Sequence, residues 1–87
     1  MEIGEKIRFL RESEGLTRDE FADKTELSAR TLEGWETLKR KISVVDIQKI
    51  TQHEQFSKYT LWLLNDIVMP EAGQISPEME EKRGLRA

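Results

Sequence analysis

The sequence predicts an all-α fold, with a compact five-helix domain in residues 1–66 followed by a tail in residues 67–87. Three observations support this prediction: the chain is short, its apolar residues recur at helical spacing, and helix-capping residues precede the apolar stretches. The 87 residues are 37% hydrophobic and 36% charged, so the core must be small. A chain of this size buries only about 60% of its extended surface, and helices with mostly local contacts suit such a core.

The first helix is expected from Ile3 to Glu14, because Gly15 follows it as a helix-ending residue. Its inner face is predicted from the apolar residues Ile3, Ile7 and Leu10. Two pairs of opposite charge at i,i+4 spacing, Glu2–Lys6 and Arg8–Glu12, are expected on the solvent side.

Thr17 is predicted to begin the second helix through a capping box with Glu20. Residues 26–28 then form a turn, and Ser28 is a suitable N-cap for a third helix that ends near Thr37. Leu32 and Trp35 lie three residues apart and are expected to anchor this third helix in the core.

The fourth helix is expected after Ser43, with an apolar stripe formed by Val44, Ile47 and Ile50. Ser57 is predicted to cap a short fifth helix that runs from Tyr59 to about Asn65. The composition changes at Pro70, where prolines, glycines and charges leave little to bury. The segment that follows is expected to be mobile or docked on a partner, with one or two helical turns in residues 78–83.

The composition also excludes several classes of protein. The chain has no cysteine and one histidine, His53, so we expect no disulfide, metal site or cofactor. Its carboxylates are spread at charge-pairing intervals rather than clustered as an acid–base set, so we expect no enzyme. No apolar run approaches the roughly 20 residues of a membrane span, and the N-terminus does not resemble a signal peptide. These absences predict a cytoplasmic protein.

The charge distribution is more informative than the net charge of −3. An acidic balance counts against binding to nucleic acid, whose partners are usually basic. However, residues 37–41, TLKRK, carry three positive charges and no negative one. Because local charge decides contacts with phosphates, this run is a candidate for binding a nucleic-acid backbone.

Residues 3–65 resemble the Cro/phage-repressor type of helix-turn-helix domain, also called XRE-like. The matching motifs are IGEKIRFLRESEGLT, then FADK, then S-x-x-T-L-x-x-W-E with its KRK extension. The resemblance implies a lambda-repressor-like domain whose third helix enters the major groove of double-stranded DNA. It also implies a buried ion pair between Arg11 and Glu36.

The resemblance assigns DNA-contacting roles to ten residues. Those at the start of the third helix face the groove or the phosphates beside it: Ser28, Ala29, Arg30, Thr31 and Glu33. Those expected on the DNA backbone are Arg18, Thr37, Lys39, Arg40 and Lys41. Physical chemistry agrees, because the forked donors of Arg30 suit guanine, and Glu33 accepts from cytosine while repelling phosphate.

The first hypothesis is therefore a sequence-specific transcriptional repressor, associated with the nucleoid. It would act as a homodimer, joined through the fifth helix or the tail, on a near-palindromic operator. The alternative is a protein-interaction module or an antitoxin with the same fold, whose tail would bind a protein partner. Glu33 on the groove face and Glu26 at a turn position where the family often has glycine motivate this alternative.

Overall fold

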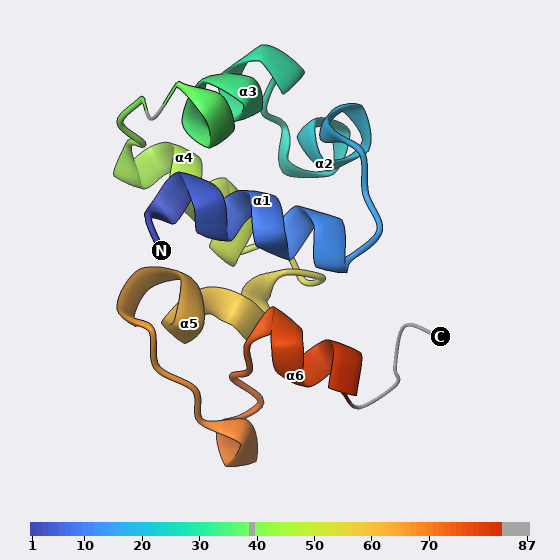
Figure 1. Ribbon diagram of the computed structural model, residues 1–87, viewed down its shortest axis with the longest axis vertical. Coiled ribbons are helices and arrows are strands. Elements are labelled where there is room, and N and C mark those ends of the chain that lie inside the picture. Colours follow the sequence, from blue (N-terminus) through green and yellow to red (C-terminus); the bar gives the residue numbers. More distant parts are fainter. Residues whose placement is uncertain (39, 83–87) are drawn as a thin grey trace.

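The computed structural model describes residues 1–38 and 40–82, and within these ranges the chain is helical with no strand (Figure 1). The helices are α1 (Ile3–Ser13), α2 (Arg18–Thr25), α3 (Ala29–Thr37), α4 (Val44–Thr51), α5 (Thr60–Asn65) and α6 (Pro77–Lys82). Two short 3-10 helices are interspersed, η1 (Ser57–Tyr59) and η2 (Pro70–Ala72). The all-α prediction is confirmed.

Helix α1 lies in the middle of the molecule and contacts both of its halves. Figure 1 shows α2 and α3 on one side of α1, and α5 and α6 on the other. None of the helices in the described part of the chain is long and apolar enough to cross a lipid bilayer.

Local capping bonds begin three of these helices where the sequence predicted them. The Thr17 hydroxyl accepts from the Glu20 amide at 3.1 Å, and the Glu20 carboxylate accepts from the Thr17 amide at 2.8 Å. Ser28 and Ser43 accept from amides three residues further on, at 3.0 and 3.1 Å. The predicted cap at Ser57 is wrong, because this residue lies in η1 and Tyr59 precedes α5 without a side-chain cap.

The core forms where α1, α2, α3, α4, η1 and α5 meet. Its buried apolar side chains are Ile7, Leu10, Phe21, Ala22, Leu32, Trp35, Ile47, Ile50, Phe56, Tyr59, Leu63 and Ile75. Two predicted core residues are instead exposed, Ile3 by 36% and Val44 by 70%. Each is the first residue of its helix. Helical spacing alone therefore overstated the buried stripe.

Lys6 also departs from the prediction, because it is buried rather than on the solvent side. Its ammonium donates to the carbonyl oxygens of Trp62 and Leu63 at 3.0 and 3.3 Å, and it pairs with the Asp66 carboxylate at 2.6 Å. It therefore satisfies the C-terminal carbonyls of α5, where a positive charge is favourable.

Part of the segment predicted as a tail packs on the helical body. Ile75 and Glu80 are buried, and the Ile75 amide donates to the Lys58 carbonyl at 2.9 Å. Lys58 also pairs with Glu80 at 3.2 Å and with Glu14 at 3.4 Å, which ties α6 to α1. This arrangement differs from the mobile or partner-docked segment that the composition predicted. The composition did not reveal it, because the segment buries a carboxylate that is paired with Lys58 as well as an apolar side chain.

Candidate nucleic-acid interface

The turn between α2 and α3 holds the two helices in a fixed relation. Glu26 ends α2 in the left-handed conformation, with a φ of 60°, and the Leu27 amide donates to the Ala22 carbonyl at 3.0 Å. The buried Thr25 hydroxyl donates to the Phe21 carbonyl at 2.7 Å. The turn is therefore formed without glycine, at a conformational cost of about 1–2 kcal/mol at Glu26.

Helix α3 has one buried side and one open side. Leu32 and Trp35 are buried on the inner side, as predicted. The Ser28, Arg30 and Glu33 side chains are exposed at its start, and Ala29 and Thr31 are half-buried beside them. Thr37 is exposed at its end, where its hydroxyl donates to the Glu33 carbonyl at 2.7 Å. The predicted groove-facing residues thus lie together on an open surface, and their contacts with DNA stay a prediction.

The start of α2 lies beside this surface. A shallow hollow runs between the two helix starts and is lined by Thr17, Arg18, Asp19, Ala29, Arg30 and Glu33. Residues from both helices can therefore contact one ligand that covers the hollow.

A buried carboxylate connects the hollow to the interior. The Glu36 side chain is fully buried, and it accepts from Arg11 Nε and Nη2, each at 3.0 Å. Arg18 Nε donates to the same carboxylate at 3.1 Å. The predicted Arg11–Glu36 ion pair is confirmed. Arg18 was assigned to the DNA backbone by the resemblance, and nothing in the sequence pattern indicates that it also joins this ion pair.

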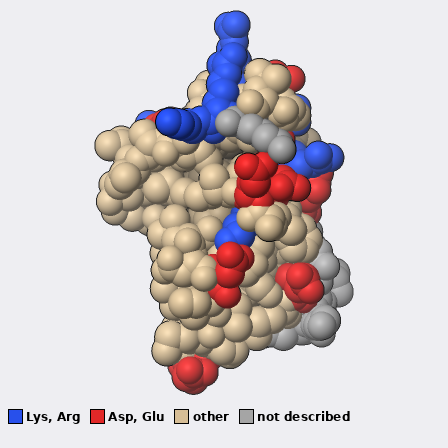
Figure 2. Space-filling model, turned by 60° about the vertical axis from the view of Figure 1, so that its left-hand side comes forward, with Lys and Arg blue, Asp and Glu red and all other residues tan. Residues whose placement is uncertain are grey.

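Positive charge gathers at the end of the molecule that carries α3. Figure 2 shows Lys and Arg side chains projecting from this end, with acidic side chains below them. The exposed basic residues here include Arg30, Arg40 and Lys41. Lys39, which was also assigned to the DNA backbone, lies outside the described residues.

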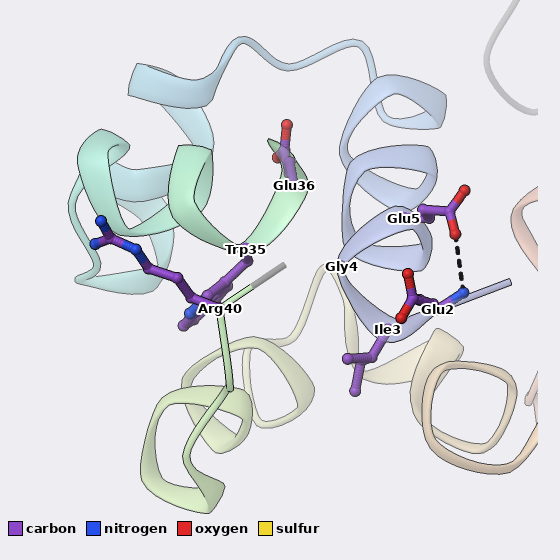
Figure 3. Close-up of a pocket in the computed structure, with 7 residues that line it drawn as sticks. All are labelled: Glu2, Ile3, Gly4, Glu5, Trp35, Glu36 and Arg40. Carbon is purple, nitrogen blue, oxygen red and sulfur yellow. Dashed lines mark hydrogen bonds between the residues drawn. The ribbon is translucent and has the colours of Figure 1, made fainter. Parts of the chain in front are cut away.

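Arg40 borders a second, smaller hollow between α1 and α3, with a volume of about 50 Å³. Figure 3 shows its guanidinium turned away from Glu36 and from the Glu2 and Glu5 carboxylates that line the same hollow. The Arg40 amide donates to the Gly34 carbonyl at 3.1 Å, which fixes the backbone after α3. Its charge is therefore available at the surface.

The comparisons with known proteins agree with this geometry. A family model described as helix-turn-helix matches residues 7–53. The chain is also similar to Repressor protein C of Escherichia phage P2, with 39% identity over 77 residues. That alignment covers 88% of this chain and 78% of the phage protein.

Proposed function

We propose that this chain, which belongs to the helix-turn-helix family, is a DNA-binding transcriptional repressor. Its α3 recognises the operator in the major groove. The open start of α3, bordered by basic side chains, is the observation that carries the proposal. Its similarity to a phage repressor gives the direction of regulation. Proteins of this family are not enzymes, and an operator-bound repressor needs no catalytic group.

Base recognition is assigned to three side chains on the open face of α3. Arg30 is exposed and suits the O6 and N7 acceptors of guanine. Glu33, one helical turn further on, accepts from the cytosine amino group, and Ala29 contacts a thymine methyl. Because Glu33 also repels phosphate, it supplies discrimination rather than affinity.

Contacts with the DNA backbone are assigned to the residues around that face. Ser28 and Thr31 are assigned to the phosphates beside the groove, and the remaining backbone contacts are assigned to Arg18, Thr37, Lys39, Arg40 and Lys41. Each phosphate neutralised in this way adds about 0.9 to the slope of log affinity against log salt. The affinity of a single domain therefore falls steeply as salt is raised.

A second copy of the chain doubles these contacts, and an apolar flank suits that role. The flank consists of Leu38, Val44, Val45, Leu64, Ile67 and Val68, each of them 40–70% exposed. In Figure 1 the start of α4 and the end of α5 lie on the same side of the molecule. Figure 2, in which that side comes forward, shows a broad area without charged side chains. Pairing through this area leaves the start of α3 uncovered.

A two-fold axis through the apolar flank implies a near-palindromic operator with half-sites about 34 Å apart. Selection of bound sequences from random duplex DNA tests the whole proposal. We expect an enriched, inverted repeat. Direct repeats or a single half-site would contradict the two-fold axis, and no enriched site would contradict sequence-specific binding.

The selected operator then tests the assignment of Arg30. In Arg30→Ala we expect discrimination to fall at one base pair in each half-site, by roughly 1–3 kcal/mol. Lys41→Ala is the matched control, because it removes the same charge from a proposed backbone contact and should weaken binding to all sequences alike. An equal loss on every sequence for Arg30→Ala would contradict its role in base recognition.

A further inference from the structure

Glu36 binds two arginines that come from different helices. Arg11 of α1 donates to both carboxylate oxygens, and Arg18 of α2 donates through Nε alone. Within residues 1–38 and 40–82, neither terminal amino group of Arg18 has a recorded hydrogen-bond partner. The Nε edge of the Arg18 guanidinium is thus held by Glu36, while its two terminal amino groups stay available.

The burial of the three side chains is graded from the interior to the surface. The Glu36 side chain is 0% exposed, that of Arg11 9%, and that of Arg18 34%. Arg11 alone neutralises the carboxylate, so the cluster of two guanidinium groups and one carboxylate keeps one positive charge. Because Arg18 is the most exposed member, that charge is available to an anion at its position.

We propose that Glu36 is a positioning residue for DNA binding, which holds Arg18 through Nε so that its two terminal amino groups clamp one backbone phosphate. This inference rests on the proposed function. Arg18 is the first residue of α2 and lines the hollow that also contains Arg30. A duplex whose bases meet α3 therefore places a phosphate over Arg18.

The chemistry of arginine explains how one side chain serves both sides. A guanidinium has five donors in a rigid plane, so Nε binds the buried carboxylate while the outer amino groups bind a phosphate in bidentate fashion. A lysine ammonium at this position is a single centre. It pairs with Glu36 or reaches the phosphate, but it does not hold both in fixed geometry.

The contact also connects recognition to the interior. Arg11 Nη1 donates to the Leu16 carbonyl at 2.8 Å, directly before the cap of α2. Glu36 lies in the last turn of α3. The cluster therefore joins the start of α2 to the last turn of α3, so that the phosphate contact sets the depth of α3 in the groove.

A double-mutant cycle tests the positioning role. The dissociation constant for the selected operator is measured, over a range of salt, for wild type, Arg18→Ala, Glu36→Gln and the double variant. We expect Arg18→Ala to lose affinity about tenfold or more and to lower the salt slope by about 0.9 for each subunit bound. Glu36→Gln should lower affinity in the wild-type background and leave it unchanged when Arg18 is already alanine.

Two outcomes would overturn the inference. One is an equal effect of Glu36→Gln in both backgrounds, which a merely structural role produces. The other is no effect in either. Wild-type protein that binds no DNA would overturn the proposed function itself, whereas binding with an additive cycle overturns the positioning role alone.

A second variant keeps the inference testable if Glu36→Gln does not fold, as checked by its circular dichroism and thermal unfolding. Arg18→Lys keeps the charge at a partly exposed position. We expect its operator affinity to stay below that of wild type, because an ammonium does not hold Glu36 and the phosphate together in fixed geometry, and wild-type affinity would contradict the clamp. Arg8→Ala is the control, because it removes an exposed arginine that pairs with Glu12 on α1, outside the hollow, and should leave the slope unchanged.

Discussion

Gly4 lets α1 and α3 approach each other closely. A Cβ atom on Gly4 would lie 2.1 Å from the Trp35 carbonyl oxygen, which belongs to the backbone of α3 (Figure 3). A Cβ on Gly34 would meet only the flexible Arg40 side chain, at 3.0 Å. The two positions are therefore very different in their tolerance of a methyl group, although both lie in helices.

The first prediction compares these two glycines. Gly4→Ala should lower the free energy of unfolding by about 1–3 kcal/mol, because the two helices must separate to admit the methyl group. Gly34→Ala should be neutral or should raise it by up to about 1 kcal/mol, since alanine favours a helix and Arg40 can move. Urea unfolding followed by circular dichroism measures both. Equal effects would contradict the close approach.

The Glu14 carboxylate makes stability depend on pH. Burial raises the pKa of Glu14, but hydrogen bonds from Tyr59 and Gln55 and the charge of Lys58 outweigh that effect and leave the pKa below its ordinary value. Tyr59 donates to this carboxylate at 2.5 Å and Gln55 at 2.9 Å. A lowered pKa in the folded state means that the charged form stabilises the protein.

The second prediction follows from the sign of that shift. The contribution of Glu14 is fully present above its unfolded pKa and is lost as the pH falls through the lower folded pKa. Glu14→Gln should therefore be less stable than wild type near pH 7, and the two should converge toward about pH 3. Chemical unfolding at a series of pH values measures the difference. A difference that does not change with pH would rule out this role.

At the scale of the elements, two non-glycine residues end helices in the left-handed conformation. Glu26 ends α2 with a φ of 60°, and Asp66 ends α5 with a φ of 58°. They differ in their contacts, because Asp66 pairs with the buried Lys6 at 2.6 Å. Glu26 is exposed, and its left-handed backbone carries a conformational cost.

The third prediction is that glycine helps at one of these caps only. Glu26→Gly should raise the free energy of unfolding by about 0.5–1 kcal/mol, because glycine adopts the left-handed conformation without steric cost. The greater entropy that glycine gives the unfolded chain offsets only part of this gain. Asp66→Gly should lower stability, since it leaves the buried Lys6 ammonium without its carboxylate. Thermal unfolding of both variants tests the comparison, and a destabilised Glu26→Gly would show that its left-handed backbone is not strained.

These elements also show what the sequence could predict. The starts of α2, α3 and α4 depend on caps that act within three residues, so the local pattern located them. The exposure of Ile3 and Val44 depends on how other elements pack around the start of each helix, which spacing does not report. The packing of α6 was missed because Glu80 is buried through a partner, Lys58, that is 22 residues away.

The candidate site likewise has features that the sequence predicts and one contact that it does not. Exposed positions on α3 follow from helical periodicity once Leu32 and Trp35 are placed in the core. The Arg18–Glu36 contact does not, because an arginine at a helix start carries no sign of the carboxylate it will meet. Such a contact exists only after the turn at Glu26 has set the angle between α2 and α3.

At the scale of the whole molecule, opposite surfaces have different chemistry. The chain has a net charge of −3, yet its basic side chains gather at the α3 end (Figure 2). An acidic body is repelled by DNA while the α3 end is attracted, so the charge distribution orients the protein before contact. The apolar flank lies to the side of that end and can bind a second copy without covering it.

The last prediction tests that flank. Val45 is 65% exposed at the start of α4, so Val45→Lys should fold normally. Two like charges brought together across a two-fold axis cost several kcal/mol, and we expect self-association to weaken at least about 30-fold. Sedimentation equilibrium should show the mass of two chains for wild type and of one for the variant. Operator affinity should fall with it, although the new lysine alone would favour DNA.

Gln48→Lys is the matched control on the same helix. Gln48 lines a hollow with Lys24, Thr25 and Glu26, at the end of α2, and does not belong to the apolar flank. The Gln48→Lys variant adds the same charge as Val45→Lys, and it should keep both the dimer and the operator affinity of wild type. A Val45→Lys protein that still has the mass of two chains would place the joint elsewhere, and the α5 end of the flank could then be tested with Leu64→Lys. A wild-type protein that remains a single chain on its operator would exclude the two-fold arrangement, because one α3 would then supply all of the recognition.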